Sequence, residues 1–355
     1  MNSKKEYTLS MKSLLPLLPL LILLTLASPV LALSAMSPSI LFSQEVIAIA
    51  PDGTPYPAQT IDPAAIPGMR TYDFDLGGGR ALQICSNLAD PESRGLNETA
   101  GVVQRSYRYI EAASGRTLER GVLLYIIEME RIPVSYRFQA SYQEAQWGEV
   151  RLALVEPGQD LFGPNAAEGL TELIYDTIPH ELGHDVLSGM PCMLHDLDGE
   201  ASVHTRWFIE GICEVLAKGF AGQEDPTLLK RFMALRKVGT VLDDLSVRDQ
   251  LFSWAQHNGN QMVLESDLYG AALLVMMAWT EKVELVTLLD RLERDSRSFC
   301  GNDLVALLGV TTGLGREEMI ERASLLGQRI EEEIFLVKNE ADSGDVLTVS
   351  TRAGS

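Results

Sequence analysis

The pattern of apolar and polar residues changes character about halfway along the chain. In the first half the apolar runs are short. The stretch "GVLLYIIEM" (121–129) is continuously apolar and predicts a buried strand, whereas "VSYRFQASY" (134–142) alternates strictly and predicts a strand with one solvated face. "EVRLALVEPG" (149–158) predicts a third strand that ends at its Pro-Gly turn. A helix is expected before these strands, at about 99–113.

From about residue 165 onward, the apolar positions recur at helical spacing. The run "GAALLVMMAW" (270–279) is too short to span a bilayer, so it predicts a helix of the core. We therefore expect an α+β fold, in which a small N-terminal mixed sheet with helices precedes a mainly helical C-terminal part. The helices of that part are expected at 166–176, 178–188, 205–219, 226–236, 262–280, 283–294, 302–308 and 315–337.

The N-terminal segment has the composition of an export signal rather than of a folded element. Three lysines precede a leucine-rich stretch at 14–26, and small residues then fit a cleavage site after Ala32, with Ala35 as the second choice. We expect residues 1–32 to be a signal peptide and the protein to be exported, either periplasmic or secreted. An uncleaved membrane anchor is the minority alternative, because the apolar stretch is nearly as long as a bilayer is thick.

Composition divides the rest of the chain. Residues rich in Pro, Ala and Gly precede the first clear helix and predict an irregular or propeptide-like lead-in, with one short strand at 45–50. The last residues, "KNEADSGDVLTVSTRAGS", predict a mobile tail. The expected divisions are a lead-in at 33–98, a globular domain at 99–337 with its sheet part at 99–160 and its helical part at 165–337, and a tail at 338–355.

Composition and charge also exclude some classes of partner. Hydrophobic residues make up 46% of the chain, enough for a substantial core, and the formal net charge is −20. So negative a protein is not expected to bind nucleic acid, which requires a basic surface, and gives no reason to bind anionic lipid. Export would permit disulfides, and the four cysteines allow three full pairings. None forms a C-x-x-C pair, so a buried or structural role is favoured for Cys85, Cys192, Cys213 and Cys300.

The candidate chemistry centres on the stretch "YDTIPHELGHDVLSGM" (175–190). His180 and His184 stand four residues apart, so both project from one face of a helix and two imidazole nitrogens can meet one cation. Glu181 follows the first histidine, where it reaches a water beside the metal without coordinating the metal itself. H-E-x-x-H is a signature of zinc hydrolases for this reason, and a chance match is the alternative.

Pro179 influences where the helix that carries this motif begins. It has no N–H, so a helix running unbroken from upstream would lose a hydrogen bond there and kink. Alternatively, the helix starts afresh at Ile178 with Thr177 as its N-cap and the proline in the tolerated first turn. Both versions predict a helix of about three turns that is bent or broken at 177–179.

A catalytic zinc site normally has three protein ligands and one open position. The downstream candidates are His195, His204, Glu210 and Glu214. The two glutamates are favoured, because they share one face of the apolar helix "RWFIEGICEVLAKGF", which can lay Glu210 against the histidine pair. Glu214, one turn further on, is then placed to accept a hydrogen bond from one of the two histidines. His195 is the runner-up ligand.

The motif HELGH followed by W-x-x-E-G-x-x-E (207–214) resembles the gluzincin branch of the zinc metallopeptidases, kin to thermolysin and to the zinc aminopeptidases. The resemblance implies a zincin-like fold with an active-site cleft between its sheet part and its helical part, a Zn²⁺ ion, and Glu210 as the third ligand. The matching stretch runs from about Gly121 to Asp295. Between His184 and Glu210 lie 25 residues, somewhat more than in the best-known members.

Patterns of related families limit which zinc metallopeptidases the sequence resembles. Leu187 and Met190 stand where metzincins carry glycine and histidine, and no G-x-M-E-N segment supports trimming of free N-termini. Many small gluzincin domains place a tyrosine at the start of the next long helix, and Tyr269 in "ESDLYGAALLVMMAW" matches that position. Its hydroxyl would donate to an oxyanion, and a tyrosine that caps a core helix is the alternative. His204 and His257 are lesser candidates for the oxyanion role.

The resulting hypothesis is an exported zinc metallopeptidase, a hydrolase that cleaves a peptide or protein substrate. A zinc-activated water attacks the peptide bond, with Glu181 as general base and Tyr269 at the oxyanion. The strand beginning at Glu149 would pair with an extended substrate. One alternative is an exported zinc-binding protein without peptidase activity, in a binding or assembly role. Another is a helical interaction protein in which HELGH is coincidental. Substrate, endo- or exo-cleavage and oligomeric state stay open.

Overall fold

The computed structural model describes five stretches of the chain, 66–129, 147–188, 200–254, 262–295 and 303–342. The export signal expected at 1–32 and the strands expected at 45–50 and 134–142 fall outside these stretches and stay predictions. Within the described stretches, no helix is both long enough and apolar enough to cross a membrane.

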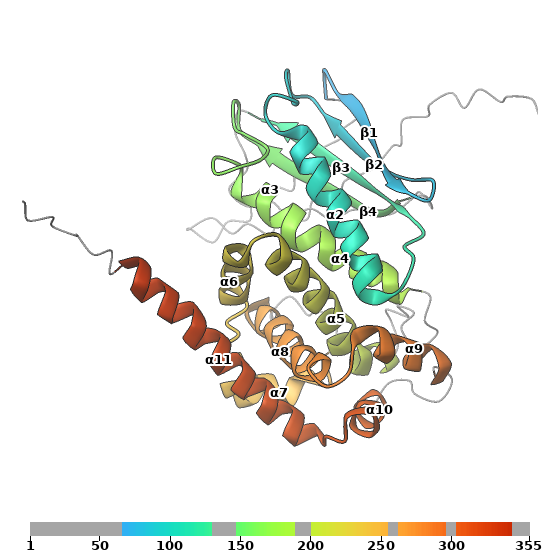
Figure 1. Cartoon of the computed structure of the whole chain (residues 1–355), viewed down its shortest axis with the longest axis vertical. Coiled ribbons are helices and arrows are strands. Elements are labelled where there is room, and N and C mark those ends of the chain that lie inside the picture. The colour runs from blue at the N-terminus through green and yellow to red at the C-terminus, as the bar shows by residue number, and fades with distance from the viewer. Residues whose placement is uncertain (1–65, 130–146, 189–199, 255–261, 296–302, 343–355) are drawn as a thin grey trace, which may run out of the picture. The chain divides into compact units, whose positions relative to one another are not determined.

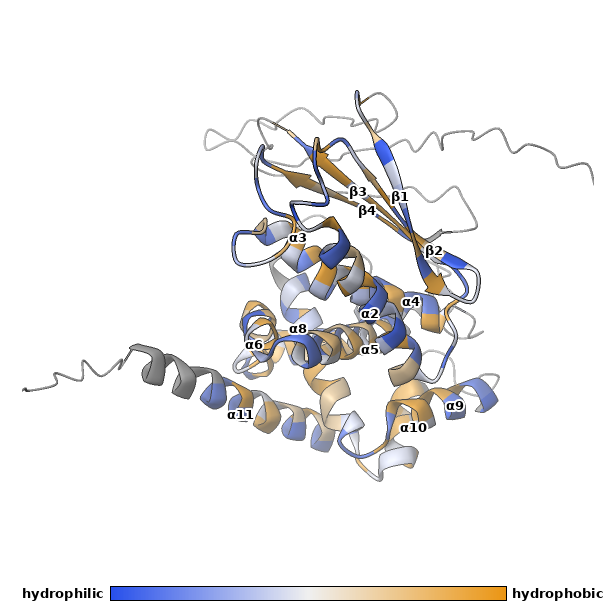
Figure 2. Cartoon of the chain, turned by 45° about the horizontal axis from the view of Figure 1, so that its top comes forward, coloured by the Kyte–Doolittle hydropathy of each residue, from blue (hydrophilic) through white to orange (hydrophobic). Residues whose placement is uncertain are grey.

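The described strands form one mixed sheet in the order β1-β2-β3-β4. β1 (Arg70–Gly77) and β2 (Arg80–Ser86) are antiparallel, whereas β3 (Gly121–Glu128) and β4 (Trp147–Val155) run parallel to β2. α2 (Leu96–Ser114) connects β2 to β3, as a parallel pair requires. β3 is buried at all but its last residue, and Figure 2 shows that β3 and β4 are largely hydrophobic. Both strands confirm the prediction from their apolar runs.

The hairpin of β1 and β2 occupies part of the lead-in expected to be irregular at 33–98. Along β1, Tyr72 and Phe74 alternate with exposed polar residues, which is the period of two of a strand with one solvated face. The turn contains three consecutive glycines at 77–79, all with positive φ, a conformation that costs glycine little. The irregular lead-in is therefore a wrong prediction for residues 70–86.

Helices cover one face of this sheet. α2, α3 (Glu168–Glu172) and α4 (Ile178–Leu187) lie along it in Figure 1, and α3 and α4 contact β4. The main hydrophobic core fills the space between sheet and helices, and a smaller apolar cluster occupies the opposite face. Because side chains alternate along a strand, Glu149 and Arg151 of β4 share the helical face with Ala153 of the main core. Two charged side chains of the sheet thus face the helix that carries HELGH.

The helical part continues from α4. α5 packs against α4 and also against α8, which Figure 1 shows further from the sheet. The fold is α+β, with a small N-terminal mixed sheet followed by a mainly helical part, and this confirms the predicted class. The helices of this part are α5 (Glu200–Glu224), α6 (Pro226–Leu235), α7 (Leu245–Leu251), α8 (Met262–Thr280), α9 (Leu285–Asp295), α10 (Asp303–Thr312) and α11 (Arg316–Asp342).

Two of these helices differ from the sequence expectations. The periodicity does not predict α7, which is only about two turns long and begins at a cap, where the Asp244 carboxylate accepts a hydrogen bond from the Ser246 N–H at 2.8 Å. α11 continues to Asp342, so the mobile tail is a wrong prediction for residues 338–342. The glutamates and the lysine near this end are good helix formers, and they extend the helix.

Pro179 neither breaks the helix nor restarts it. α3, a π turn η2 (Leu173–Thr177) and α4 form one continuous helical run, and Thr177 keeps helical dihedral angles of φ −66° and ψ −51°. The N–H of Ile178 donates to the carbonyl five residues back. The π turn widens the backbone where the proline lacks an N–H and its ring would press on the carbonyl four residues back. The bend or break expected at 177–179 is therefore replaced by a π turn.

Candidate metal centre

Three side chains from two helices converge where α4 contacts α5. His180 and His184 project from one face of α4, and Glu210 projects toward them from α5. Oε2 of Glu210 lies 3.2 Å from Nε2 of His180 and 3.5 Å from Nε2 of His184. Ligands held about 2.1 Å from one metal ion have separations of this size. The structure thus brings together the three residues that the sequence assigns to a zinc ion.

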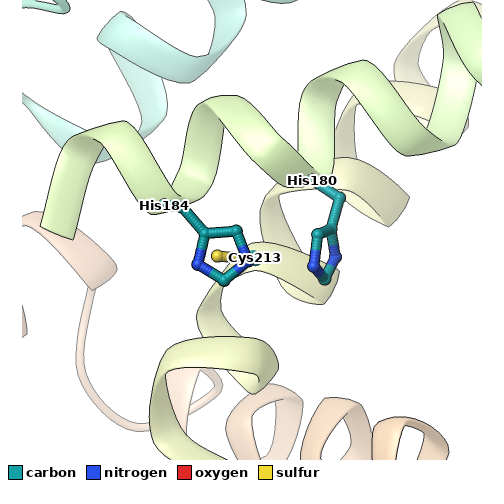
Figure 3. Close-up of side chains that lie close together, drawn as sticks. All are labelled: His180, His184 and Cys213. Carbon is teal, nitrogen blue, oxygen red and sulfur yellow. The ribbon is translucent and has the colours of Figure 1, made fainter. Parts of the chain in front are cut away.

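Cys213 adds a sulfur donor at the same place. Figure 3 shows it next to His184, and one potential ligand atom from each of His180, His184 and Cys213 lies within 4.8 Å of the others. Two donor sets therefore share the histidine pair, one completed by the Glu210 carboxylate and one by the thiol. Two imidazoles with a carboxylate or a thiolate make a donor set that suits Zn²⁺.

Protonation distinguishes the two candidate third ligands. Burial raises the pKa of Cys213 to about 11, so its thiol keeps the proton at neutral pH. Burial also disfavours a charge on Glu210, but hydrogen bonds and charge from His180 and His184 outweigh it and hold the pKa of this carboxyl well below its usual range. A metal ion binds a carboxylate or a thiolate rather than a thiol. In the metal-free site Glu210 is therefore already ionised, whereas Cys213 would have to lose its proton on binding a cation.

Two glycines allow the helices to approach this closely. A Cβ atom on Gly183, inside HELGH, would lie 2.9 Å from both Cα and Sγ of Cys213. A Cβ atom on Gly211, next to Glu210, would lie 2.8 Å from the carbonyl oxygen of Ala272 on α8. Real Cβ atoms essentially never approach so closely, so any larger residue would push α5 away from α4 or from α8. The ligand spacing depends on both glycines.

Glu214 lies at the centre of a buried charge network behind the ligands. Its Oε1 is 3.3 Å from Nδ1 of His180, the ring nitrogen that does not face Glu210. Lys218 Nζ donates to its Oε2 at 2.7 Å, and Arg236 Nη2 donates to its Oε1 at 2.6 Å. Burial opposes a charge on His180, but Glu210 and Glu214 outweigh that effect and raise the pKa of His180 to about 10. A carboxylate in this position fixes the orientation of the imidazole.

An arginine of the sheet holds the Glu181 side chain. Its Oε1 lies 2.6 Å from Nη2 of Arg151, while its Oε2 lies 4.0 Å from Nε2 of His184. Arg151 in turn contacts Glu149, with 2.5 Å between Nε and Oε1. Burial raises the pKa of Glu149 to about 8 against the opposing charge of Arg151. With 30% of its side chain exposed, Glu181 is accessible from solvent and next to the metal donors at the same time.

Tyr269 lies beside the first histidine. The ring centroids of Tyr269 and His180 are 5.9 Å apart in an edge-on arrangement, and Trp254 and the Arg236 guanidinium pack on the tyrosine ring at 4.9 Å and 5.1 Å. Burial and the negative charge of Glu210 raise the pKa of Tyr269 far above its usual value, so the hydroxyl stays protonated and can donate a hydrogen bond. This hydroxyl also makes a hydrogen bond with Arg206, and the oxyanion role stays a prediction.

A groove of about 430 Å³ lies between β4 and the helical run that leads into α4. The strand contributes residues 152–154, and the helical run contributes α3 and η2 as far as Thr177, three residues before His180. Glu156, Glu168 and Glu172 make its rim acidic. The groove therefore lies beside the strand expected to bind substrate and ends at the turn before α4, and none of the metal donors lines it.

Several residues of the sequence hypothesis are not placed by the structure. The runner-up ligand His195 and the oxyanion candidate His257 lie outside the described stretches, and the side chain of His204 is not described either. Cys192 and Cys300 also lie outside the described stretches. Cys85 and Cys213 are both unpaired thiols. The described part of the chain therefore contains no disulfide.

Sequence reasoning overlooked three residues of the site. Cys213 had a detectable signal, because it stands three residues after Glu210 and so on the same face of α5. Arg151 had a weaker one, because the alternation along β4 places it on the helical face. Arg236 had none, because it reaches Glu214 from beyond the end of α6 and only the tertiary fold brings the two together.

Comparisons with known proteins give only distant likenesses, among solved structures. No family model matches the sequence, and no curated protein matches it. Among solved structures, the chain is similar to an aminopeptidase N family protein from Idiomarina loihiensis, with 9% sequence identity and a TM-score of 0.48. The likeness covers 80% of this chain and 52% of that one, so the chain spans about half the length of that protein. A likeness this distant carries no conclusion about activity.

Proposed function

We propose that this protein is a zinc-dependent metallopeptidase. The observation that carries the proposal is the position of Glu210, whose Oε2 lies 3.2 Å and 3.5 Å from the Nε2 atoms of the HELGH histidines. A histidine pair from one helix and a carboxylate from a second helix make the three-ligand set of a catalytic zinc site. Such a site keeps one position for water or substrate, which a purely structural zinc site does not need.

His180, His184 and Glu210 would hold the ion in this proposal. Bound zinc would supply Lewis acidity, which polarises a peptide carbonyl and acidifies a water. Glu181 accepts the proton of the attacking water and then passes it to the leaving amine, a role for which its exposed carboxylate beside His184 is suited. Tyr269 donates a hydrogen bond to the developing oxyanion, since its buried hydroxyl keeps its proton.

The substrate in this proposal is an extended peptide. The groove between β4 and α3 offers a strand along which such a peptide would pair, and it leads to the turn before His180. The leader at 1–32 would direct the protein out of the cytoplasm, to the periplasm or the medium. Export and peptide specificity are both parts of the proposal that rest on the sequence.

Replacement of Glu181 by Gln tests the proposal. The Glu181→Gln variant should bind zinc with the stoichiometry of the parent protein, measured by elemental analysis, and should lose cleavage of fluorescently labelled casein. Glu321→Gln, an exposed glutamate of α11, is the matched control and should change neither quantity. Full cleavage by Glu181→Gln would contradict the proposal, as would a parent protein that holds zinc and cleaves no peptide in a diverse library.

Cys213 favours a second candidate function, a zinc-binding protein without peptidase activity. If the thiol joined the two histidines and Glu210 as a fourth protein ligand, the site would be closed to water. Cys213→Ser separates the two functions. A peptidase of the proposed kind keeps its zinc affinity and its activity in this variant, whereas a closed structural site loses much of its zinc affinity. Competition with a fluorescent zinc chelator measures the difference.

A further inference from the structure

The two carboxylate oxygens of Glu181 face two different partners. Oε1 lies 2.6 Å from Nη2 of Arg151 on β4, whereas Oε2 lies 4.0 Å from Nε2 of His184. One oxygen is therefore occupied by a guanidinium from the sheet, and the other is turned toward the nitrogen donors of the metal centre. The two contacts together define the direction of the whole carboxylate.

Arg151 is itself fixed on three sides. Its backbone pairs in register with Leu124 of the buried strand β3. Its Nε lies 2.5 Å from Oε1 of Glu149, two residues earlier on the same face of β4. The Arg151 side chain is 16% exposed and the Glu149 side chain 9%, so neither is a solvated surface group. The guanidinium thus contacts the buried Glu149 with one nitrogen and the carboxylate of Glu181 with another.

We propose that Arg151 is a positioning residue for Glu181, and that Glu149 holds Arg151 in place for this task. The inference rests on the proposed function of Glu181. By binding Oε1, Arg151 leaves Oε2 as the oxygen that faces the metal donors, where the attacking water must give up its proton. A glutamate side chain free to change rotamers would lose entropy each time it adopted this orientation, and the arginine removes that cost before substrate arrives.

An ion pair that merely ties β4 to α4 predicts different behaviour. Removing such a pair would lower the free energy of unfolding and would have no specific effect on the chemical step. A positioning role also demands the geometry of a guanidinium, which bridges two carboxylates with separate nitrogens, whereas a lysine offers a single charged nitrogen. It further predicts that a free guanidinium ion can replace the deleted side chain, provided that the cavity and both carboxylates remain.

The test uses Arg151→Ala and Arg151→Lys in the full chain loaded with zinc, with labelled casein as substrate. In Arg151→Ala we expect kcat to fall about tenfold to a hundredfold with KM and zinc content nearly unchanged. Millimolar guanidinium chloride should restore part of kcat in Arg151→Ala but not in Glu181→Gln. Arg151→Lys should have a lower kcat than the parent protein. Arg322→Ala, which removes an exposed ion pair on α11, should have the kcat of the parent protein. Unchanged kcat in Arg151→Ala, or a rise in KM alone, would overturn the proposal.

A structural readout separates this inference from the proposed function. Crystal structures of the zinc-loaded parent protein and of Arg151→Lys should show the Glu181 carboxylate directed at the metal in the parent and turned away or disordered in the variant. If the parent protein cleaves no peptide, the peptidase proposal fails, while these structures still decide whether Arg151 orients Glu181. An identical Glu181 orientation in both proteins would refute the positioning role even if the enzyme is active.

Discussion

The ammonium nitrogen of Lys218 lies 2.5 Å from Oδ1 of Asp176. Lys218 is 2% exposed, and Asp176 belongs to the π turn η2, so this ion pair ties the turn before the HELGH helix to α5. The same nitrogen donates to Glu214 at 2.7 Å, and Glu214 in turn faces Nδ1 of His180. A chain of buried charged contacts therefore connects the π turn with a metal ligand.

We predict that Lys218→Met weakens both the fold and the metal centre. It leaves Asp176 as a buried carboxylate without this cation, and breaking a buried pair in this way costs about 3–5 kcal/mol. Because Glu214 would lose one of its donors and shift, zinc affinity should fall about tenfold to a hundredfold. Chemical denaturation measures the first effect and chelator competition the second.

The double variant Asp176→Asn, Lys218→Met is the control for that prediction. It removes the cation and its partner together, so it should regain part of the lost stability, since no isolated charge is left at the π turn. A single Lys218→Met variant as stable as the parent protein would show that the buried network contributes nothing to this fold.

Zinc affinity should rise with pH over an unusually wide range. The pKa of His180 is raised to about 10, so the metal-free site is protonated there at pH 7, and zinc must displace that proton. Each displaced proton increases the apparent affinity by about tenfold per pH unit until the pH passes that pKa. Calorimetry in two buffers with different ionisation enthalpies counts the protons released, and a count of zero at pH 7 would contradict the charged state of His180.

The same raised pKa makes the stability of the metal-free protein depend on pH. The pKa of His180 in the folded state lies above its ordinary value of 6.5. Its charged contacts with Glu210 and Glu214 therefore stabilise the fold fully below about pH 6.5, and this contribution is lost as the pH rises through about 10. Thermal melts of zinc-free protein across this interval should show a decline that His180→Gln makes shallower.

Gly183→Ala should separate α4 from α5. The new methyl group would lie 2.9 Å from the Cα and Sγ atoms of Cys213, and backbone cannot yield as a flexible side chain does. We expect a loss of about 1–3 kcal/mol in the free energy of unfolding and a weaker zinc site, because Glu210 moves with α5. Gly169→Ala on α3 is the matched control: no atom lies within 4 Å of its Cβ, so this helix should gain stability.

Tyr269→Phe distinguishes an oxyanion donor from a helix-packing tyrosine. The phenylalanine keeps the ring contacts with Trp254 and His180, so the thermal midpoint should change little. If the hydroxyl binds the oxyanion, kcat for casein should fall by about a hundredfold to a thousandfold. Tyr72→Phe on β1, at the other end of the strand order from β4, should leave kcat unchanged. Equal rates in both variants would assign Tyr269 to packing.

Local periodicity predicted most of this fold. The strand predicted from the continuous apolar run of β3 and the helices predicted at α4, α5 and α8 are present in the structure, because burial dominates each of these elements. The Pro-, Ala- and Gly-rich composition of the lead-in hid the β1–β2 hairpin, although Tyr72, Phe74 and Leu76 of β1 alternate at strand spacing. Pro179 suggested a break because a π turn has no sequence signal of its own.

The residues of the site also fall into those that the sequence predicts and those that it does not. His180, Glu181 and His184 follow from spacing within one helix, and Glu210 and Glu214 follow from spacing within a second. Arg151 and Arg236 do not, because each reaches the site from an element whose distance from the motif is fixed only by tertiary packing. Charged side chains near a predicted centre become informative only when strand and helix faces are placed against each other.

The π turn η2 also sets the rotational phase of the metal-binding helix. An α-helix advances about 100° per residue, and a π turn accommodates one residue more than an α turn. If the same residues closed as ordinary α-helix without the π turn, α4 would rotate by about 100° relative to α3. His180 and His184 would then point away from α5 although HELGH itself was intact. The π turn upstream of Pro179, as much as the motif, directs the two imidazoles toward α5.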